Sequence, residues 1–231
     1  LKMIADARAE GLDVMADQYP YTASMTHLSV CIPPKYFTHG ISGMVEYLKD
    51  PQTREQIKAE ISDPNTLEFE NQLQNSGGFE GVFISRASKT PEVEGMTIAE
   101  YAAKSGLDPY DILFDILIKN NGVASAIYFA MSEEDVFRII KDENVVVGTD
   151  GIVKSAEERA HPRAYGSFPR AINYFVKEKK VLPLEEMISK MTSRTAKATM
   201  IENKGEIKDG FDADIVVFDY DTIRDTANFI E

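Results

Sequence analysis

Hydrophobic residues are spaced in two ways along the chain, and the alternation of the two patterns predicts an α/β protein. Residues 12–19 and 144–151 are short, mostly apolar runs that end in polar turns, which is typical of buried parallel strands. Around them, apolar side chains recur every three or four residues, as on the buried face of a helix. Helix, glycine turn and strand over 1–19, and strand, helix and strand over 124–151, predict parallel strands joined by right-handed crossovers.

Helix-start signals are clearest in the middle of the chain. Thr97 and Glu100 have the spacing of a capping box, which predicts a helix that runs to about Ser105. Asp108 followed by Pro109 is a second start signal, because proline is favoured in the first turn of a helix. Apolar residues at helical spacing follow this second signal, so we expect its helix to be half buried.

The remaining segments differ in character. Residues 41–80 are polar and broken by two Asp-Pro pairs, which predicts one or two surface helices and a loop. A strand is expected at 81–85, and helices are expected at 167–179 and 183–200. Residues 213–219 are rich in valine and isoleucine, so we expect a strand of a small β element there.

Composition narrows the class of protein. With 231 residues, 43% hydrophobic and 27% charged, the chain is an ordinary soluble globular sequence. A net charge of -13 argues against nucleic-acid binding, because an acidic surface repels phosphates. No apolar run reaches the roughly 18–20 residues that span a bilayer. We therefore expect no membrane partner. The single cysteine, Cys31, cannot form an internal disulfide, which suits a reducing compartment, so we expect a cytoplasmic protein.

Candidate metal ligands are few. The three histidines are His27, His39 and His161, and none lies in an H-x-H or H-E-x-x-H pair. The chain therefore does not carry a complete metal site of a familiar kind. It also opens on a helical pattern without an initiator methionine, and we expect it to be a fragment of a longer protein.

The strongest chemical signal is Asp150. It follows a β-branched run, at the carboxyl end of an expected buried strand, where α/β proteins place catalytic groups. A carboxylate there can bind a metal, accept a proton from water, or do both. The alternative is that Asp150 only closes a turn, because Asp-Gly pairs are common in turns.

Two further segments carry polar side chains in a constrained backbone. Residues 160–170 contain two prolines, a glycine and Arg163, whose guanidinium can hold a carboxylate through two parallel hydrogen bonds. The alternative is a surface loop with exposed cations. Residues 17–24 place an acid, an amide and phenols, including Tyr19, at the end of the first expected strand, and ordinary strand-end polarity explains them equally well.

Taken together, these segments resemble one family, the N-acyl-D-amino-acid deacylases of the amidohydrolase superfamily. Residues 17–23 resemble its D-x-Y-P-Y-x-A segment, and 148–151 resemble G-[ST]-D-G. Residues 161–170 resemble the specific pattern H-P-R-x-[YW]-G-[ST]-F-P-R. Residues 190–196 and 205–219 resemble K-M-T-x-x-x-A and G-x-I-x-x-G-x-x-A-D-[IL]-V-V-F-D, of which the last is shared widely among amidohydrolases.

The resemblance implies the C-terminal part of a distorted (β/α)8 barrel. Residues 1–40 and 111–200 would be barrel segments. Residues 41–110 would be an insertion that forms a lid over the pocket, and residues 201–231 would begin a small β-sandwich. Most ligands for one or two zinc ions are then expected upstream of this chain, so we expect the chain alone to be inactive.

The resemblance also implies roles for single residues. Asp150 would bind metal and act as general acid and base, and Arg163 would hold the substrate carboxylate together with Tyr19. His161 and Tyr165 would support their loop. The superfamily's strand-six histidine has no direct counterpart, so His27 is the nearest candidate ligand, and Cys31 is a weaker one.

The implied activity is zinc-dependent hydrolysis of a small-molecule N-acyl-D-amino acid to a free D-amino acid and a carboxylate. Two alternatives stay open at this point. One is an amidohydrolase that acts on cyclic amides, similar to hydantoinases or dihydroorotases, although the H-P-R segment argues against it. The other is a non-catalytic, amidohydrolase-like fragment.

Overall fold

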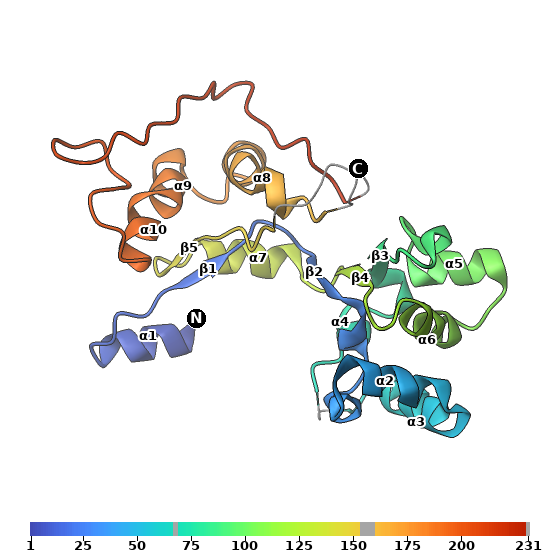
Figure 1. Cartoon of the computed structure of the whole chain (residues 1–231). Helices are drawn as coiled ribbons and strands as arrows, with labels where there is room; N and C mark the ends of the chain where they lie inside the picture. Colours follow the sequence, from blue (N-terminus) through green and yellow to red (C-terminus); the bar gives the residue numbers. More distant parts are fainter. Residues whose placement is uncertain (67–68, 153–159, 230–231) are drawn as a thin grey trace.

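The computed structural model describes residues 1–66, 69–152 and 160–229. Its strands form two separate sheets (Figure 1). In the first sheet, β1 (Ala16–Gln18) pairs in parallel with β5 (Val145–Val147), with Ala16 opposite Val145. In the second, the antiparallel order is β2 (Ser24–His27), β4 (Ser125–Tyr128) and β3 (Val82–Arg86). Parallel strands were expected from the sequence, and β1 and β5 form such a pair.

Helices surround both sheets. Before β4 the chain forms α1 (Lys2–Ala9), α2 (Gly40–Lys49), α3 (Pro51–Ser62), α4 (Gln72–Asn75), α5 (Ile98–Ser105) and α6 (Pro109–Lys119). After β4 it forms α7 (Glu133–Ile140), α8 (Arg163–Arg170), a π-helix (Ala171–Glu178), α9 (Leu184–Met191) and α10 (Ser193–Ala198). Short 3-10 turns lie at Leu28–Cys31, Pro34–Phe37, Phe79–Gly81 and Pro91–Val93. Among the described residues, no helix is long and apolar enough to cross a membrane.

The capping signals act as expected. Thr97 and Glu100 form a complete capping box at the start of α5, and Gly106 ends that helix with a positive φ of 73°. Asp108 accepts backbone hydrogen bonds at the start of α6, and the Ser132 side chain caps α7. These caps satisfy N–H groups that a helix leaves without an internal partner, so they fix where each helix begins.

Two local expectations need correction in the C-terminal half. The helix expected at 167–179 begins at Arg163 and continues past Pro169 as a π-helix from Ala171, because proline has no N–H to donate to the α-helical ladder. The helix expected at 183–200 is two helices, since the backbone of Thr192 leaves the helical region with φ -129° and ψ -93°.

The expected crossover from strand 124–129 to strand 144–151 is wrong. β4 does not join β5 in the parallel sheet, because β2 and β3 occupy both of its edges. The helix that follows, α7, instead packs on β5. A strand with both edges already paired has no N–H or C=O row left for a third strand, so β4 belongs to the antiparallel sheet.

Two hydrophobic cores follow this division. The first contains buried side chains from Leu28 to Tyr128 and packs the antiparallel sheet against α2, α3, α5 and α6; we call this part the small-sheet region. The second packs β5 against α7, the π-helix and α9; we call this part the barrel region. The small-sheet core contains side chains from both sides of position 110, where the expected lid segment ends. The expected division of the chain into segments 1–40, 41–110, 111–200 and 201–231 stays a prediction.

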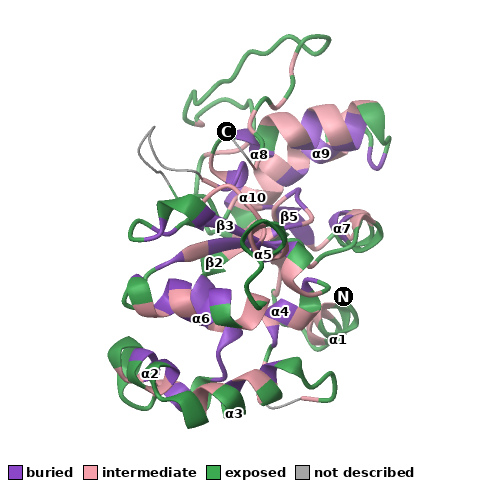
Figure 2. Ribbon diagram, turned by 90° about the vertical axis from the view of Figure 1, so that its right-hand side faces the viewer, coloured by how far each residue is buried: buried purple, intermediate pink, exposed green. Residues whose placement is uncertain are grey.

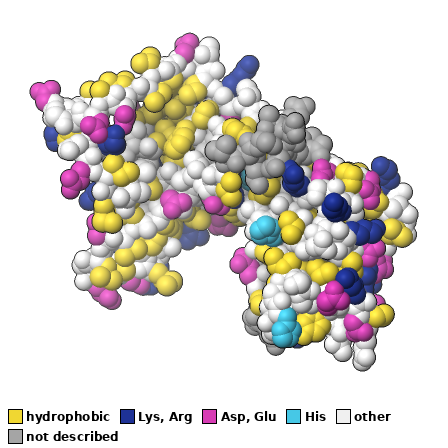
Figure 3. Space-filling view, in the orientation of Figure 1, with side chains coloured by type: hydrophobic (Ala, Val, Ile, Leu, Met, Phe, Trp, Pro, Cys, Tyr) yellow, Lys and Arg dark blue, Asp and Glu magenta, His cyan; other side chains and the backbone are white. Residues whose placement is uncertain are grey.

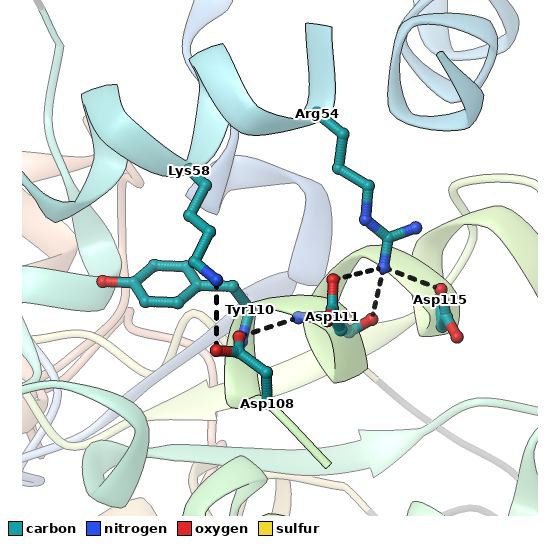
Figure 4. Close-up of polar contacts among 6 residues, drawn as sticks. All are labelled: Arg54, Lys58, Asp108, Tyr110, Asp111 and Asp115. Carbon is teal, nitrogen blue, oxygen red and sulfur yellow. Dashed lines mark hydrogen bonds and ion pairs between the residues drawn. The ribbon is translucent and has the colours of Figure 1, made fainter. Parts of the chain in front are cut away.

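An ion-pair network clamps α3 onto α6 on the outside of the small-sheet region (Figure 4). Arg54 donates from Nη2 to carboxylate oxygens of Asp111 and Asp115, at 2.9 Å each. Lys58 pairs with Asp108 at 3.0 Å, and its ammonium lies 5.2 Å from the centroid of the Tyr110 ring. The expected surface helix α3 is thus held against α6 by ion pairs. Ile57 and Ile61 lie on the same face of α3 at helical spacing and are fully buried.

The expected strand at 213–219 is not formed among the described residues. The segment is extended without ladder partners, and Val216 and Val217 are 84% and 92% exposed. Strand propensity alone does not make a strand, because a strand needs a neighbour to pair its backbone groups. Figure 2 shows the exposed course of this part of the chain above α8 and α9.

Candidate active site

The candidate site is a cavity where the two regions meet. One wall comes from the ends of β2 and β4, and the other comes from the chain after β5 and the start of α8. The lining residues are Met25, Thr26, His27, Ser125, Asp150, Ile152, Ala160, His161, Arg163 and Ala164. Asp150 and Arg163, the two strongest candidates from the sequence, therefore lie in one cavity together with His27.

Asp150 occupies a tight turn directly after β5. A Cβ atom at Gly148 would lie 2.3 Å from a carboxylate oxygen of Asp17, so the turn passes close to β1 only because residue 148 is glycine. Thr149 Oγ1 accepts the N–H of Gly151 at 3.2 Å. Asp150 has a positive φ of 44°, a conformation that aspartate tolerates. The Asp150 carboxylate pairs directly with Arg163. A side-chain hydrogen bond within the turn comes from Thr149.

Arg163 is held from three sides at the start of α8. Only 7% of the residue is exposed. Its Nη2 atom lies 2.7 Å from Asp150 Oδ2 and donates to the carbonyl oxygen of Met25 at 3.3 Å. The guanidinium lies 4.8 Å from the centroid of the Tyr19 ring. These contacts hold the planar Arg163 guanidinium beside Asp150. A guanidinium held in place in this way is suited to bind an anion.

The aromatic ring of Tyr19 lies against the Arg163 guanidinium. Burial raises the pKa of its phenol, and the positive charge of Arg163 opposes that rise. Tyr19 therefore stays a neutral phenol at physiological pH and contributes a ring face together with a hydrogen-bonding hydroxyl. Its proposed role in substrate binding stays a prediction, and its place beside Arg163 is consistent with it.

His161 ties the Arg163 loop to the chain after β1. The residue is 2% exposed, and its Nδ1 accepts the backbone N–H of Arg163 at 3.0 Å. Nε2 then carries the proton and donates to the carbonyl oxygen of Ala23 at 2.8 Å. Burial lowers the pKa of His161 to about 4, so the ring is neutral. Both ring nitrogens are used, which supports the expectation that His161 braces the loop.

Sequence patterns missed an aromatic cluster on the far side of His161. Phe229 meets the His161 ring edge to face, with centroids 5.0 Å apart, and contacts Phe129 in the same way at 5.1 Å. Tyr21 contacts His161 at 5.1 Å. Tyr21 and Phe229 are 208 positions apart, so no local spacing could have revealed the cluster.

The two weaker metal-ligand candidates have different surroundings. His27 is exposed at the end of β2, opposite Ser125, and lines the cavity, so its role as a ligand stays a prediction. Cys31 is fully buried, and its Sγ lies 3.7 Å from the hydroxyl of Tyr128. Burial raises the pKa of the Cys31 thiol to about 12, which keeps it protonated and unsuited to bind metal. Within the described part of the chain, no three His, Cys, Asp or Glu side chains are grouped to hold a metal ion.

Comparison with known proteins establishes the family. Residues 61–228 match the model of the amidohydrolase family, and this chain belongs to that family. Over 139 residues it is 38% identical to the D-aminoacylase of Alcaligenes xylosoxydans xylosoxydans, covering 60% of this chain and 27% of that protein. Over 229 residues it is 32% identical to the N-acyl-D-glutamate deacylase of the same organism, covering 99% and 37%.

Solved structures agree with this assignment. The N-acyl-D-glutamate deacylase of Bordetella bronchiseptica, solved with zinc and a phosphonate inhibitor, matches with a TM-score of 0.70 and 29% identity over 100% of this chain and 38% of that one. A D-aminoacylase crystal structure matches with a TM-score of 0.68 and 28% identity over 99% and 37%. The fold is therefore that of part of an amidohydrolase barrel, and the chain spans well under half the length of these relatives.

Proposed function

We propose that the polypeptide containing this chain is a zinc-dependent N-acyl-D-amino-acid deacylase. It would hydrolyse the amide of a small-molecule N-acyl-D-amino acid to a free D-amino acid and a carboxylate. The observation that carries the proposal is the placement of Asp150 and Arg163 in one cavity, with a carboxylate at a strand end and a buried cation beside it. The similarity to D-aminoacylase and to D-glutamate and D-aspartate deacylases supports the same reaction.

Asp150 fits as one zinc ligand from this chain. Its side chain is 64% exposed at the carboxyl end of a barrel strand, and a carboxylate oxygen is a suitable donor for zinc. The described residues do not provide a complete ligand set, so further ligands are proposed to come from elsewhere in the polypeptide, with His27 as the candidate from this chain. Zinc, when bound, supplies Lewis-acid activation of the amide carbonyl and of water.

The residues of this chain divide the remaining work. Asp150 accepts a proton from the attacking water and later delivers it to the leaving amine. Arg163 and Tyr19 bind the substrate. Arg163 holds the α-carboxylate, and the Tyr19 ring lies against the guanidinium. Anchoring of the carboxylate, with the amide directed at Asp150, fixes the reacting groups in place. The proposed preference for the D isomer rests on the similarity to deacylases of D-amino acids.

The chemistry of the cavity and of the surface supports a small-molecule substrate. The net charge of -13 opposes nucleic-acid binding, so neither nucleic acid nor a membrane is proposed as a partner. A cytoplasmic location is proposed on the basis of the single, buried and reduced cysteine.

The test compares release of free amino acid from N-acetyl-D-methionine and N-acetyl-L-methionine by the full polypeptide with zinc. Only the D isomer is expected to be cleaved. Asp150→Asn is expected to lower kcat by about 10²–10⁴-fold, as for loss of a general acid–base. Arg163→Lys is expected to raise KM with a smaller effect on kcat, because lysine keeps the charge but loses the planar fork.

Matched controls exclude a general effect of charge. Asp209→Asn removes a carboxylate from an exposed turn, and Arg224→Lys changes an exposed arginine, so both variants should behave as wild type. Cleavage of a cyclic amide, with no cleavage of either methionine derivative, would keep the fold assignment and overturn the substrate.

A further inference from the structure

The last described residues of the chain lie against the loop that carries Arg163. We define residues 225–229 as the C-terminal strap. Phe229 at its end contacts the ring of His161, and His161 in turn accepts the backbone N–H of Arg163. A direct chain of contacts therefore links the strap to the proposed substrate-binding cation.

The strap is anchored at its other end by Asp225. The Asp225 carboxylate pairs with Arg170 Nη1 at 3.2 Å, and the Asp225 side chain is only 10% exposed. Arg170 also donates from Nε to the carbonyl oxygen of Pro20 at 2.8 Å. Its guanidinium lies 5.0 Å from the Tyr21 ring centroid and 4.3 Å from that of Tyr174. A cation held in this way is a fixed point, so the strap begins from a rigid contact.

Gly166 shows that the close approach of the strap to α8 is a built feature. A Cβ atom at Gly166 would lie 2.8 Å from the Tyr21 hydroxyl oxygen, 3.3 Å from Asp225 Cβ and 3.5 Å from Ala227 Cβ. Any larger residue there would push the strap or Tyr21 outward. The glycine three residues after Arg163 is thus explained by the passage of a distant segment rather than by a turn.

We propose that the C-terminal strap is a positioning element that holds Arg163 for the substrate carboxylate, acting through His161. The inference rests on the proposed function for its kinetic consequences. His161 has a fixed tautomer and two hydrogen bonds, so a shift of its ring moves the Arg163 backbone with it. Arg163 would contact the α-carboxylate in the ground state and in the transition state alike. Loosening of the strap therefore weakens substrate binding more than it slows the chemical step.

The kinetic test uses the full polypeptide with zinc and N-acetyl-D-methionine. Phe229→Ala is expected to raise KM by about tenfold, in the range that small misplacements of binding groups produce, with kcat within about twofold of wild type. Phe229→Leu should restore most of the loss, because leucine refills much of the same space. Phe218→Ala is the matched control; Phe218 lies in the same C-terminal segment, is 37% exposed, and makes no ring contact among the described residues.

A double-mutant cycle separates positioning from a general structural role. If the strap acts through Arg163, Phe229→Ala adds no further increase in KM to the Arg163→Ala variant. Equal increases in both backgrounds, or an unchanged KM in the single Phe229→Ala variant, would overturn the proposal. Gly166→Ala should reproduce the KM effect without touching Phe229.

A second readout does not depend on activity. Phe229→Ala should speed amide hydrogen exchange in the peptide that covers residues 160–166, because the Arg163 N–H loses a stable acceptor, whereas Phe218→Ala should not. Unchanged exchange there would contradict the strap's role even if the enzyme had a different substrate. Failure of the wild-type polypeptide to hydrolyse any N-acyl-D-amino acid would overturn the proposed function alone.

Discussion

The small-sheet region and the barrel region bury their hydrophobic side chains to different extents. In the small-sheet region, one core of mostly fully buried residues extends from Leu28 to Tyr128, and four helices close over it. In the barrel region, the core is smaller, α1 buries none of its residues, and hydrophobic side chains gather on the face over α8, α9 and α10 (Figure 3). The first region closes its own core, whereas the second leaves apolar surface uncovered. The candidate site lies between them and takes residues from both.

The largest expected effects come from matched core truncations, one in each region. Phe114 in α6 and Phe175 in the π-helix are 0% and 1% exposed. Each substitution by alanine should cost about 3–5 kcal/mol of unfolding free energy, because a large cavity remains. Hydrogen exchange should show the loss of protection in β3 and β4 for Phe114→Ala, and in β5 for Phe175→Ala. Equal loss in both regions for either variant would show that the two cores unfold as one unit.

Acid should weaken the contact between the two regions through His161. Its folded-state pKa is about 4, and its unfolded value is about 6.5. The folded state therefore binds fewer protons, so the stability contribution is complete above pH 6.5 and is lost as pH falls toward 4. The loss should approach roughly 3 kcal/mol at and below pH 4, at 1.36 kcal/mol per unit. Urea unfolding across this range should show a shallower pH dependence for His161→Gln, and an unchanged slope would contradict the assignment.

A substitution at Lys190 measures how much a buried cation and its hydrogen bonds contribute to the stability of the barrel region. The residue is fully buried, and its Nζ donates to the carbonyl oxygens of Asp142 and Val145. Burial lowers the pKa of this ammonium, so its charge is costly and its hydrogen bonds offset that cost. Lys190→Met should destabilise the chain by about 1–3 kcal/mol, because the buried carbonyl oxygen of Val145 and the partly buried one of Asp142 lose their donor. Lys197→Met, on the exposed side of α10, is the matched control, and equal effects of the two variants in urea unfolding would exclude a special role for Lys190.

The smallest effect is expected for the ion pairs outside the small-sheet region. Arg54→Met removes the contacts to Asp111 and Asp115 and should cost about 0.5–1 kcal/mol at low salt, because the two carboxylates are about half exposed to solvent. The cost should shrink as salt increases, since salt screens exposed charges. Thermal melting at low and high ionic strength measures both points. A cost that is independent of salt would indicate that the contact of the Arg54 guanidinium with the Phe114 ring, 5.2 Å from its centroid, dominates.

Some helix starts and one strand could be predicted from the sequence, because they depend on interactions between neighbouring residues. The capping box at Thr97, the start of α6 at Asp108 and the β-branched run before Gly148 each depend on neighbours within a few residues. Asp150 could be named as a catalytic candidate because α/β proteins place catalytic groups at the carboxyl ends of buried parallel strands. Arg163 could be named because its loop resembles a specific family pattern. These signals are local, so no tertiary information was needed to find them.

The strand pairings could not be read in the same way. β4 looked like a barrel strand, yet β2 and β3 pair with both of its edges, and the valine-rich segment at 213–219 has no ladder partner among the described residues. Strand propensity describes a side chain's fit to a sheet, whereas pairing depends on which backbone edge is available.

The sequence by itself thus determined where α5, α6 and α7 begin, that parallel strands are present, and which carboxylate and cation are the candidates for chemistry. Only the tertiary structure decided that these two side chains meet in one cavity, that His161 is locked as a neutral tautomer, and that Phe229 supports it. The physical reason is distance along the chain. Caps and strand ends depend on a few adjacent residues, whereas the cavity and the strap join segments as far as 208 residues apart.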